Sequence, residues 1–500
     1  MEATTIEHVF EEFTGSLADL DAAELIDAAQ EWSRAENRAT ARKLAVMAEL
    51  FSRRTGVDAA DRDGWWLDPD AAVAAELAAA LGVTQGLALH QIHRGVVLRD
   101  RLPRVAALFA DGLISDMTVR KIVYRTGLVT DAAVLAEVDA AIAAQVSRWG
   151  RLSEKKLEQA IDATVLTHDP VAVRHVVESL ARRRVEFGSP ADAPGFTSLW
   201  ALLPAADAAA LEDRLEEIAH TVCPADPRTL EARRADALGA VGAGLDALVC
   251  DCGLDDCDAA TAPRPVRNTT IYVIADQEAV EPAAKTAARS TPALIFGAGI
   301  TAAEALEPLL ARARLRHIGH PGESPAEHRY TPSVALAEFV RCRDVTCRFP
   351  GCDTPATEAD LDHTVPWPVG PTHASNLKAL CRLHHLLKTF WSGPHGWRDR
   401  QSPDGTVIWT SPTGHTYVTH PGSRERFPAL CRPTGTLWTG EPPTPERCAG
   451  REAMMPKRRR TRAQGQARYI AAQRRLNQQR LNHERLDQRH GAQPHGPPPF

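Results

Sequence analysis

Apolar residues recur at helical spacing through roughly the first half of the chain. The clearest segments are 33–54, 70–81, 104–129 and 207–222, in which apolar side chains return every three or four positions and so fall on one face. This periodicity predicts an all-helical N-terminal domain over residues 1–245.

One part of this helical region has a more specific outline. Residues 77–100 read as a helix, a glycine-containing turn and a second helix, which is the outline of a DNA-reading helix-turn-helix. Ordinary helix packing, with Leu87, Leu89 and Ile92 inside, explains the same pattern with fewer assumptions. We therefore favour packing here.

The hydrophobic period changes near residue 268. The segment 268–277 is rich in strand-forming residues, and 291–315 reads as a strand, a glycine turn and a helix that Thr301 can cap. A short mixed α/β region is therefore expected over residues 246–331.

Two further segments follow a module at 332–395. Residues 396–440 begin with alternating apolar and polar positions around Asp404-Gly405, which predicts a small β meander. Residues 441–500 comprise a Pro-rich linker and an Arg- and Gln-rich tail with too few apolar residues for a core, so a disordered or helical tail is expected. The fold class predicted for the whole chain is multidomain and mainly α.

Composition places the chain among ordinary globular proteins. It has 500 residues, of which 44% are hydrophobic and 24% charged, and this length favours more than one domain. The acidic start does not resemble a secretory signal, and no window of about 18 residues is apolar enough for a membrane span. We therefore expect a cytoplasmic protein without membrane contact, in which the ten cysteines stay reduced unless they bind metal.

Charge is distributed unevenly along the chain. The net charge is −6, yet residues 451–500 contain twelve basic and three acidic side chains, which leaves −15 for the other 450 residues. A basic tail on an acidic body is typical of an arm that binds nucleic acid, although a solvated tail has the same composition. Nucleic acid or another polyanion is the partner that this asymmetry favours, and the sequence indicates no particular protein partner.

Cysteine and histidine spacing in the module at 332–395 predicts a metal site. Cys347 and Cys352 form a C-x4-C knuckle, and Cys381 is followed by the pair His384 and His385. Three thiolates and one imidazole complete a tetrahedral structural Zn²⁺ site, and helical spacing allows either histidine to be the fourth ligand. The alternative is reduced cysteines in a small core, but a module of this size has little apolar surface and is expected to need a metal.

Zinc binding does not account for the other polar residues of the module. Hydrolysis of a phosphodiester requires a cation, a base that deprotonates water, and positive charge near the developing oxyanion. Asp362 and one of the paired histidines can hold the cation, and His363 can be the base. Lys388 or Arg382 can supply the charge.

These residues, taken together, resemble a known motif. Asp362-His363, Asn376-Leu377, Cys381, His384-His385 and Lys388 resemble the motif of HNH endonucleases, a ββα-metal unit of strand, loop, strand and helix, here of the zinc-stapled type. The whole arrangement is similar to a group of bacterial HNH proteins with a mostly helical N-terminal domain of unknown function.

The resemblance implies a role for each matching residue. His363 would be the general base, and Asp362 and His385 would bind a catalytic divalent cation such as Mg²⁺ or Mn²⁺. The side chain of Asn376 would hold the loop and orient His363, although taken alone Asn376 could cap the following helix. His384 would then join Cys347, Cys352 and Cys381 at zinc.

The chain departs from the family pattern at two places. Many relatives have a fourth cysteine where this chain has His384, which exchanges one good zinc ligand for another. Many also have paired glycines where this chain has the sequence PVGPTH at 368–373, so the loop geometry does not follow from the resemblance.

A second cysteine group lies between the two halves of the chain. Cys250, Cys252 and Cys257 could hold a second metal, with a more distant residue such as Cys223 as the fourth ligand. The alternative is an exposed loop, which would suit the neighbouring aspartates.

The function that the sequence predicts is metal-dependent hydrolysis of DNA by an HNH-type endonuclease. A zinc-stabilised nucleic-acid-binding protein without cleavage activity is the alternative.

Overall fold

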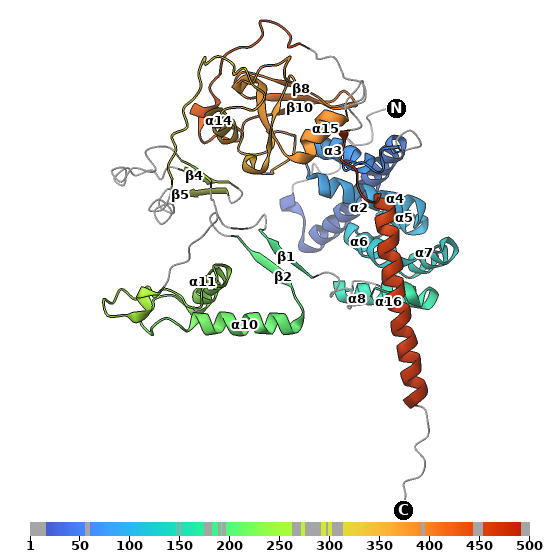
Figure 1. Ribbon diagram of the computed structural model, residues 1–500. Helices are drawn as coiled ribbons and strands as arrows, with labels where there is room; N and C mark the ends of the chain where they lie inside the picture. Colours follow the sequence, from blue (N-terminus) through green and yellow to red (C-terminus); the bar gives the residue numbers. More distant parts are fainter. Residues whose placement is uncertain are drawn as a thin grey trace, which may run out of the picture. The chain divides into compact units, whose positions relative to one another are not determined.

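The computed structural model describes residues 17–55, 61–146, 148–149, 152–174, 183–188, 192, 197–262, 272–275, 292–296, 299–302, 314–391, 396–443 and 454–491. The fold is mainly α with small antiparallel sheets (Figure 1). The chain divides into two compact units, Met1–His175 with Ile318–Phe500, and Val176–His317. The boundary after His175 falls within residues 1–245, which helical periodicity predicts as one domain, so this segment is shared between the two units.

The N-terminal part of the first unit is a helical bundle. Its α-helices are α2 (Ala22–Arg54), α3 (Pro69–Leu81), α4 (Gln85–Asp100), α5 (Pro103–Ala110), α6 (Asp116–Arg125), α7 (Ala132–Val146) and α8 (Glu154–His168). The ends of α3 show why its sequence forms a helix there. Asp68 caps the first turn, Pro69 occupies the first helical position, and Gly82 ends the helix at φ 63°, a left-handed conformation suited to glycine.

Helix α4 packs inside this bundle. Ile92 is buried in its core and Leu89 is partly buried, whereas Leu87 is 41% exposed, so the expectation that all three lie inside is wrong for Leu87. A Cβ at Gly95 would overlap the backbone of Leu44 in α2, so this close helix contact requires glycine.

In the described part of the chain no single helix is long and apolar enough to cross a membrane. Helices α3 and α4 reach that length and apolar character only as a pair, which is bent by 109°.

The C-terminal part of the first unit contains the module. It comprises α14 (Val334–Asp344), β6 (Asp360–His363), β7 (Leu377–Leu380), α15 (Arg382–Phe390), β8 (Arg398–Gln401), β9 (Val407–Thr410) and β10 (Thr416–Thr419). Strands β6 and β7 pair antiparallel, and α15 follows β7 directly. Strands β8, β9 and β10 form an antiparallel sheet in chain order, as the predicted meander requires.

One apolar core joins the module to the helical bundle. On the bundle side Ala71, Ala75 and Ala79 of α3 contribute to it, and Phe349 and Trp409 contribute from the module. Small alanine side chains allow the module to approach the helix closely. The two parts therefore share buried surface and are coupled in stability.

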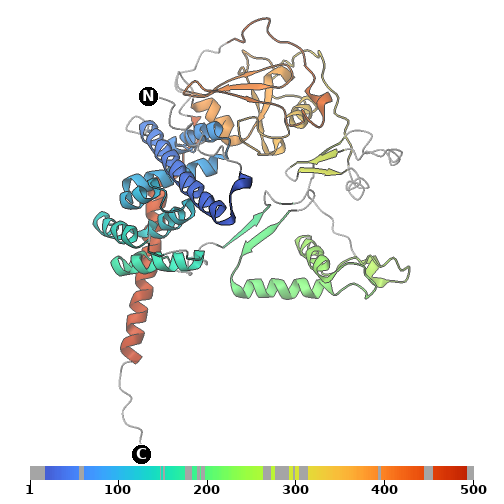
Figure 2. The same cartoon turned by 180° about the vertical axis from the view of Figure 1, so that it is seen from behind.

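The basic tail contains a helix packed on the bundle. Helix α16 (Arg462–Gly491) runs along the helical part of the first unit (Figures 1 and 2). Arg474 pairs with Asp169 at 2.6 Å, and the amide of Asn477 donates to the carbonyl oxygens of Val171 and Val173. Polar contacts thus hold a helix whose composition is poor in apolar residues.

The second unit contains short strands and a helical pair. Its elements are β1 (Arg184–Phe187), β2 (Leu199–Leu202), α10 (Ala205–Ala219), α11 (Leu230–Gly242), β3 (Val273–Ala275), β4 (Pro292–Ile295) and β5 (Gly299–Ala302). Thr301 lies in β5, which pairs with β4, so its expected role as a helix cap is wrong. The helix predicted after it falls mostly outside the described residues.

Candidate functional site

Three cysteines and one histidine of the module converge. Cys347 and Cys352 lie between α14 and β6, Cys381 is the N-cap of α15, and His384 lies in the first turn of that helix. Their ligand atoms all lie within 4.8 Å of one another. The Nδ1 atom of His384 is 3.2 Å from the sulfur of Cys381 and 3.5 Å from that of Cys347. This donor set fits a tetrahedral zinc ion, with His384 and not His385 as the imidazole ligand.

The ring of His384 is held by an aromatic stack. Phe349 lies 3.9 Å from it between ring centroids, at an interplanar angle of 10°. Both side chains are buried, so the imidazole is fixed facing the sulfur atoms.

His385 faces a different set of groups. Successive residues of an α-helix point about 100° apart, so the neighbour of a zinc ligand leaves the sulfur cluster. Its Nδ1 atom is 2.8 Å from Asp360 and its Nε2 atom is 3.5 Å from Oδ1 of Asp362. Asp360 and Asp362 share one face of β6 because strand side chains alternate.

Asp362 is a buried carboxylate shared between histidine and lysine. Its Oδ2 atom accepts hydrogen bonds from Lys378 at 2.7 Å and from Lys388 at 2.6 Å, while Oδ1 faces His385. Burial alone would raise the pKa of Asp362, but the two ammonium groups and His385 hold this pKa below its ordinary value. Both lysines also contact Asp399 of β8, at 2.6 and 3.3 Å.

His363 is oriented by Thr372 and Tyr330. The Nε2 atom of His363 is 2.8 Å from the hydroxyl oxygen of Thr372, and that hydroxyl donates its hydrogen to the carbonyl oxygen of Arg329. A hydroxyl has a single hydrogen, so Nε2 of His363 must be the donor and Nδ1 carries the lone pair. Burial lowers the pKa of His363, which favours the neutral ring, and Tyr330 stacks on it at 5.5 Å.

Asn376 closes the loop between the two strands. Its side chain accepts from the backbone of Val365 at 2.8 Å and donates to the carbonyl oxygens of Val365 and Pro371 at 3.0 and 2.9 Å. Asn376 precedes β7 while α15 begins after Cys381, so it does not cap that helix. A Cβ at Gly370 would overlap Val365 and Asn376, so the loop requires glycine at this position.

The predicted sources of positive charge occupy different places. Lys388 reaches Asp362 and also donates to the carbonyl oxygen of His363 at 2.6 Å, so it ties the two neighbouring residues together. Arg382 is largely exposed and pairs with Asp360 at 3.2 Å. The structure thus brings Lys388, and not Arg382, to the buried carboxylate.

Four residues of this arrangement do not follow from the motif, namely Asp360, Thr372, Lys378 and Asp399. Asp360 could have been predicted, because it is two positions before Asp362 in a strand and therefore lies on the same face. Lys378 lies opposite Asp362 in the strand register, but that pairing is visible only once the strands are aligned. For Thr372 and Asp399 the sequence offers no such signal.

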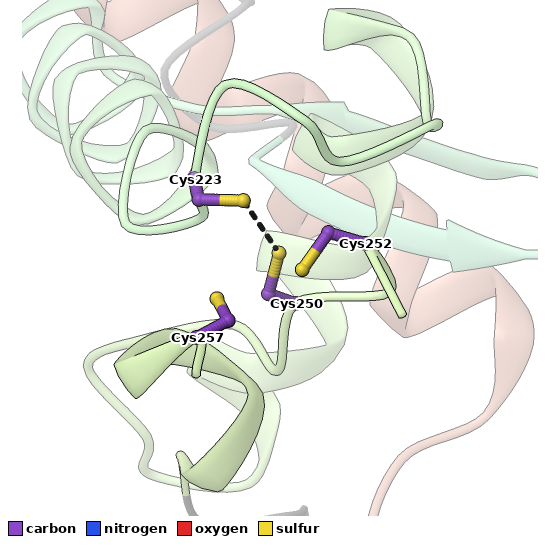
Figure 3. A group of neighbouring side chains, drawn as sticks. All are labelled: Cys223, Cys250, Cys252 and Cys257. Carbon is purple, nitrogen blue, oxygen red and sulfur yellow. Dashed lines mark hydrogen bonds between the residues drawn. The ribbon is translucent and has the colours of Figure 1, made fainter. Parts of the chain in front are cut away.

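The second cysteine group also converges. The sulfurs of Cys250, Cys252 and Cys257 meet that of Cys223 in the second unit, all within 4.8 Å of one another (Figure 3). Two clusters of this chain therefore have donors that could hold a structural metal ion such as zinc.

Known relatives cover almost the whole chain. The uncharacterized protein Rv3776 of Mycobacterium tuberculosis is 47% identical over 480 residues, which span 92% of this chain and 91% of the relative. The uncharacterized protein Rv2100 of the same organism is 44% identical over 516 residues, with 95% and 92% covered. No solved structure matches the chain.

A protein-family model also matches more than half of the chain. The family described as Domain of unknown function (DUF222) matches residues 31–344, and thus ends just before Cys347 and the ββα element. Its extent, with the identity of the relatives, shows that the chain belongs to the DUF222 family.

Proposed function

We propose that this protein is a metal-dependent endonuclease of the HNH type that hydrolyses DNA. The observation that carries the proposal is the ββα element on which Asp362 faces His385, with His363 next to Asp362 at the end of the same strand; the helix of this element also contributes to a Cys3His cluster. Asn376 closes the intervening loop, as the motif requires.

The donor atoms present fit a catalytic cation. Oδ1 of Asp362 and Nε2 of His385 lie 3.5 Å apart and face one another, while the lysines occupy the other carboxylate oxygen. Two protein ligands leave room for the several waters that an ion such as Mg²⁺ or Mn²⁺ keeps, and the carboxylate oxygen is a ligand that both ions favour. When bound, such a cation would polarise the phosphate and stabilise the leaving oxygen.

The chain's own residues supply the proton transfer. Neutral His363, with Nε2 bonded to Thr372, presents Nδ1 as the atom that takes a proton from the attacking water. Lys388 and Lys378 keep Asp362 ionised and fix its orientation. Zinc would serve the fold, since its ligands Cys381 and His384 start the helix that carries His385.

The proposal is tested by incubating the purified full chain with supercoiled plasmid and a panel of divalent cations. Cation-dependent nicking or linearisation that excess chelator stops is expected. Retention of plasmid in a binding assay with no cleavage under any cation would instead favour a zinc-stabilised nucleic-acid-binding protein.

Thr372 gives a prediction that separates orientation from folding. Replacing Thr372 with valine removes the acceptor that fixes the His363 tautomer, and residues in such supporting positions typically contribute about 10- to 100-fold to activity. We expect a loss of that size in the cleavage rate, with recovery in Thr372→Ser, which keeps the hydroxyl. Equal activity of the valine and serine variants would show that the hydrogen bond does not orient the base.

The tail gives a prediction about DNA affinity. Some basic residues of the tail form ion pairs within the protein, since Arg458 and Arg462 contact Asp68. Others are exposed, namely Lys457, Arg459, Arg460, Arg468, Arg475 and Arg485. If the exposed set contacts phosphates, neutralising Arg459, Arg460, Arg468 and Arg475 with glutamine should weaken DNA binding.

Salt dependence measures this contribution. The slope of log affinity against log salt should become shallower by about 0.9 for each phosphate that the tail no longer neutralises. Glutamine at the exposed residues Arg53 and Arg120 of the bundle is the control for a general change in charge. An unchanged slope in the tail variant would mean that α16 does not contact DNA.

A further inference from the structure

The four cysteines of the second unit come from two separate stretches of chain. Cys223 follows α10, whereas Cys250, Cys252 and Cys257 lie between α11 and the 3-10 helix η5 (Asp258–Thr261). All four side chains point toward a common centre (Figure 3), and all are free thiols. The cluster therefore links the end of α10 to the stretch after α11, in addition to the small core and the ion pairs of Arg234 with Glu212 and Glu216 that join the two helices.

The apolar core between α10 and α11 is too small for burial alone to stabilise the fold of this region. Its buried apolar members are Ile218, Val222, Ala237, Ala240, Leu248 and Cys250, with Leu215, Leu245 and the other three cysteines partly buried around them. So few large apolar side chains contribute little burial free energy, and small cores of this kind normally need a covalent or metal cross-link.

Hydrogen bonds fix both cysteine-bearing stretches. The carboxylate of Asp226 accepts from the backbone of Asp251 at 3.0 Å and from Arg228 at 2.7 Å, and Arg228 also donates to the carbonyl oxygen of Val249 at 2.7 Å. Gly253, directly after Cys252, has φ 71°, which allows the chain to turn back toward Cys257. The thiols are thus held together by the surrounding backbone.

The sulfur geometry fits one ion better than disulfides. Zinc–sulfur bonds of about 2.3 Å in a tetrahedron separate the sulfurs by about 3.8 Å. Here the sulfurs of Cys223 and Cys250 are 3.5 Å apart and all four lie within 4.8 Å. Disulfide formation would pair the sulfurs two by two, whereas this arrangement brings all four around one centre.

We propose that Cys223, Cys250, Cys252 and Cys257 bind a second zinc ion, which cross-links α10 and α11 and is required for the fold of the second unit. Four cysteine thiolates are a common donor set of tetrahedral structural zinc sites. This site is independent of the Cys3His cluster, because the two sets of ligands belong to different units.

The test is the zinc content of the full chain purified under reducing conditions. Two zinc ions per chain are expected, matching the two clusters. Cys252→Ser should retain one, as should Cys347→Ser, while Cys431→Ser, at a half-buried thiol outside both clusters, should retain two. A Cys252→Ser variant with the zinc content of the parent, a Cys347→Ser variant with no zinc, or a Cys223–Cys250 disulfide in the parent would overturn the proposal.

Alkylation of the parent chain keeps the proposal testable if Cys252→Ser fails to fold. Thiols bound to zinc react slowly, so peptide mapping should find Cys223, Cys250, Cys252 and Cys257 protected, and all four exposed together after chelation. Rapid alkylation of these thiols in the zinc-loaded chain would contradict the site.

Discussion

Replacing His363 with alanine is expected to lower the rate of plasmid cleavage by about 10²- to 10⁴-fold, the range that a general base contributes. The reason is that Nδ1 of His363 is the atom proposed to take the proton from water, and Thr372 fixes its tautomer. His363 does not belong to the Cys3His cluster, so the zinc content should be retained.

The control for this prediction is His90→Ala, at an exposed histidine of α4 outside the site. It should cleave as fast as the parent chain. A His363→Ala variant that kept more than half of the parental rate would exclude His363 as the base. Loss of zinc from that variant would show that the residue supports the fold instead.

Replacing Cys381 with serine should unfold the module. Cys381 is both a predicted zinc ligand and the N-cap of α15, the helix that carries His385 and Lys388. Zinc-binding free energies in small structural sites are about 10–16 kcal/mol, and in such sites binding free energy is folding free energy. The variant should therefore lose one zinc ion and all cleavage activity.

The effect should extend into the helical bundle. Phe349 and Leu386 of the module share a core with Ala71 and Ala75 of α3, so unfolding of the module exposes one face of that helix. Differential scanning calorimetry should show a lower melting temperature for the bundle as well. Cys431→Ser is the matched control, and a Cys381→Ser variant that lost zinc but kept the parental melting profile would show that the metal does not hold this fold.

Local patterns predicted the elements of the module well. The alternation after Trp397 indicated the strands β8 to β10, and the order of strand, loop, strand and helix around Asp362 and Cys381 follows from a motif whose residues are close in sequence. Glycine turns such as Gly405, at φ 81°, mark strand ends by their own conformational preference.

Contacts between distant segments were much harder to predict. Asp399 meets Lys378 only because β8 packs beside the ββα element, and nothing in its own strand indicates a partner. Spacing alone left open whether His384 or His385 faces the sulfurs, and the resemblance to the HNH motif assigned His384, as the structure has it. Side-chain direction on α15 separates them because neighbours diverge by about 100°.

The tail shows the limit of composition as a guide. Its Arg- and Gln-rich sequence has too few apolar residues to predict packing, yet Asn477 and Arg474 attach α16 to the bundle through polar bonds. Such bonds depend on acceptors at Asp169 and Val171, about three hundred residues away, which no local pattern reveals.

The central claim is that Asp362 and His385 form a cation site that serves DNA cleavage. It is tested most directly by titrating Mg²⁺ or Mn²⁺ into the zinc-loaded full chain and measuring the plasmid cleavage rate, with Asp362→Asn and His385→Ala alongside. The parent should cleave at a rate that saturates with cation, and both variants should lose most of that rate at unchanged zinc content. Cleavage that needs no added cation, or none in the parent at any cation concentration, would contradict the claim.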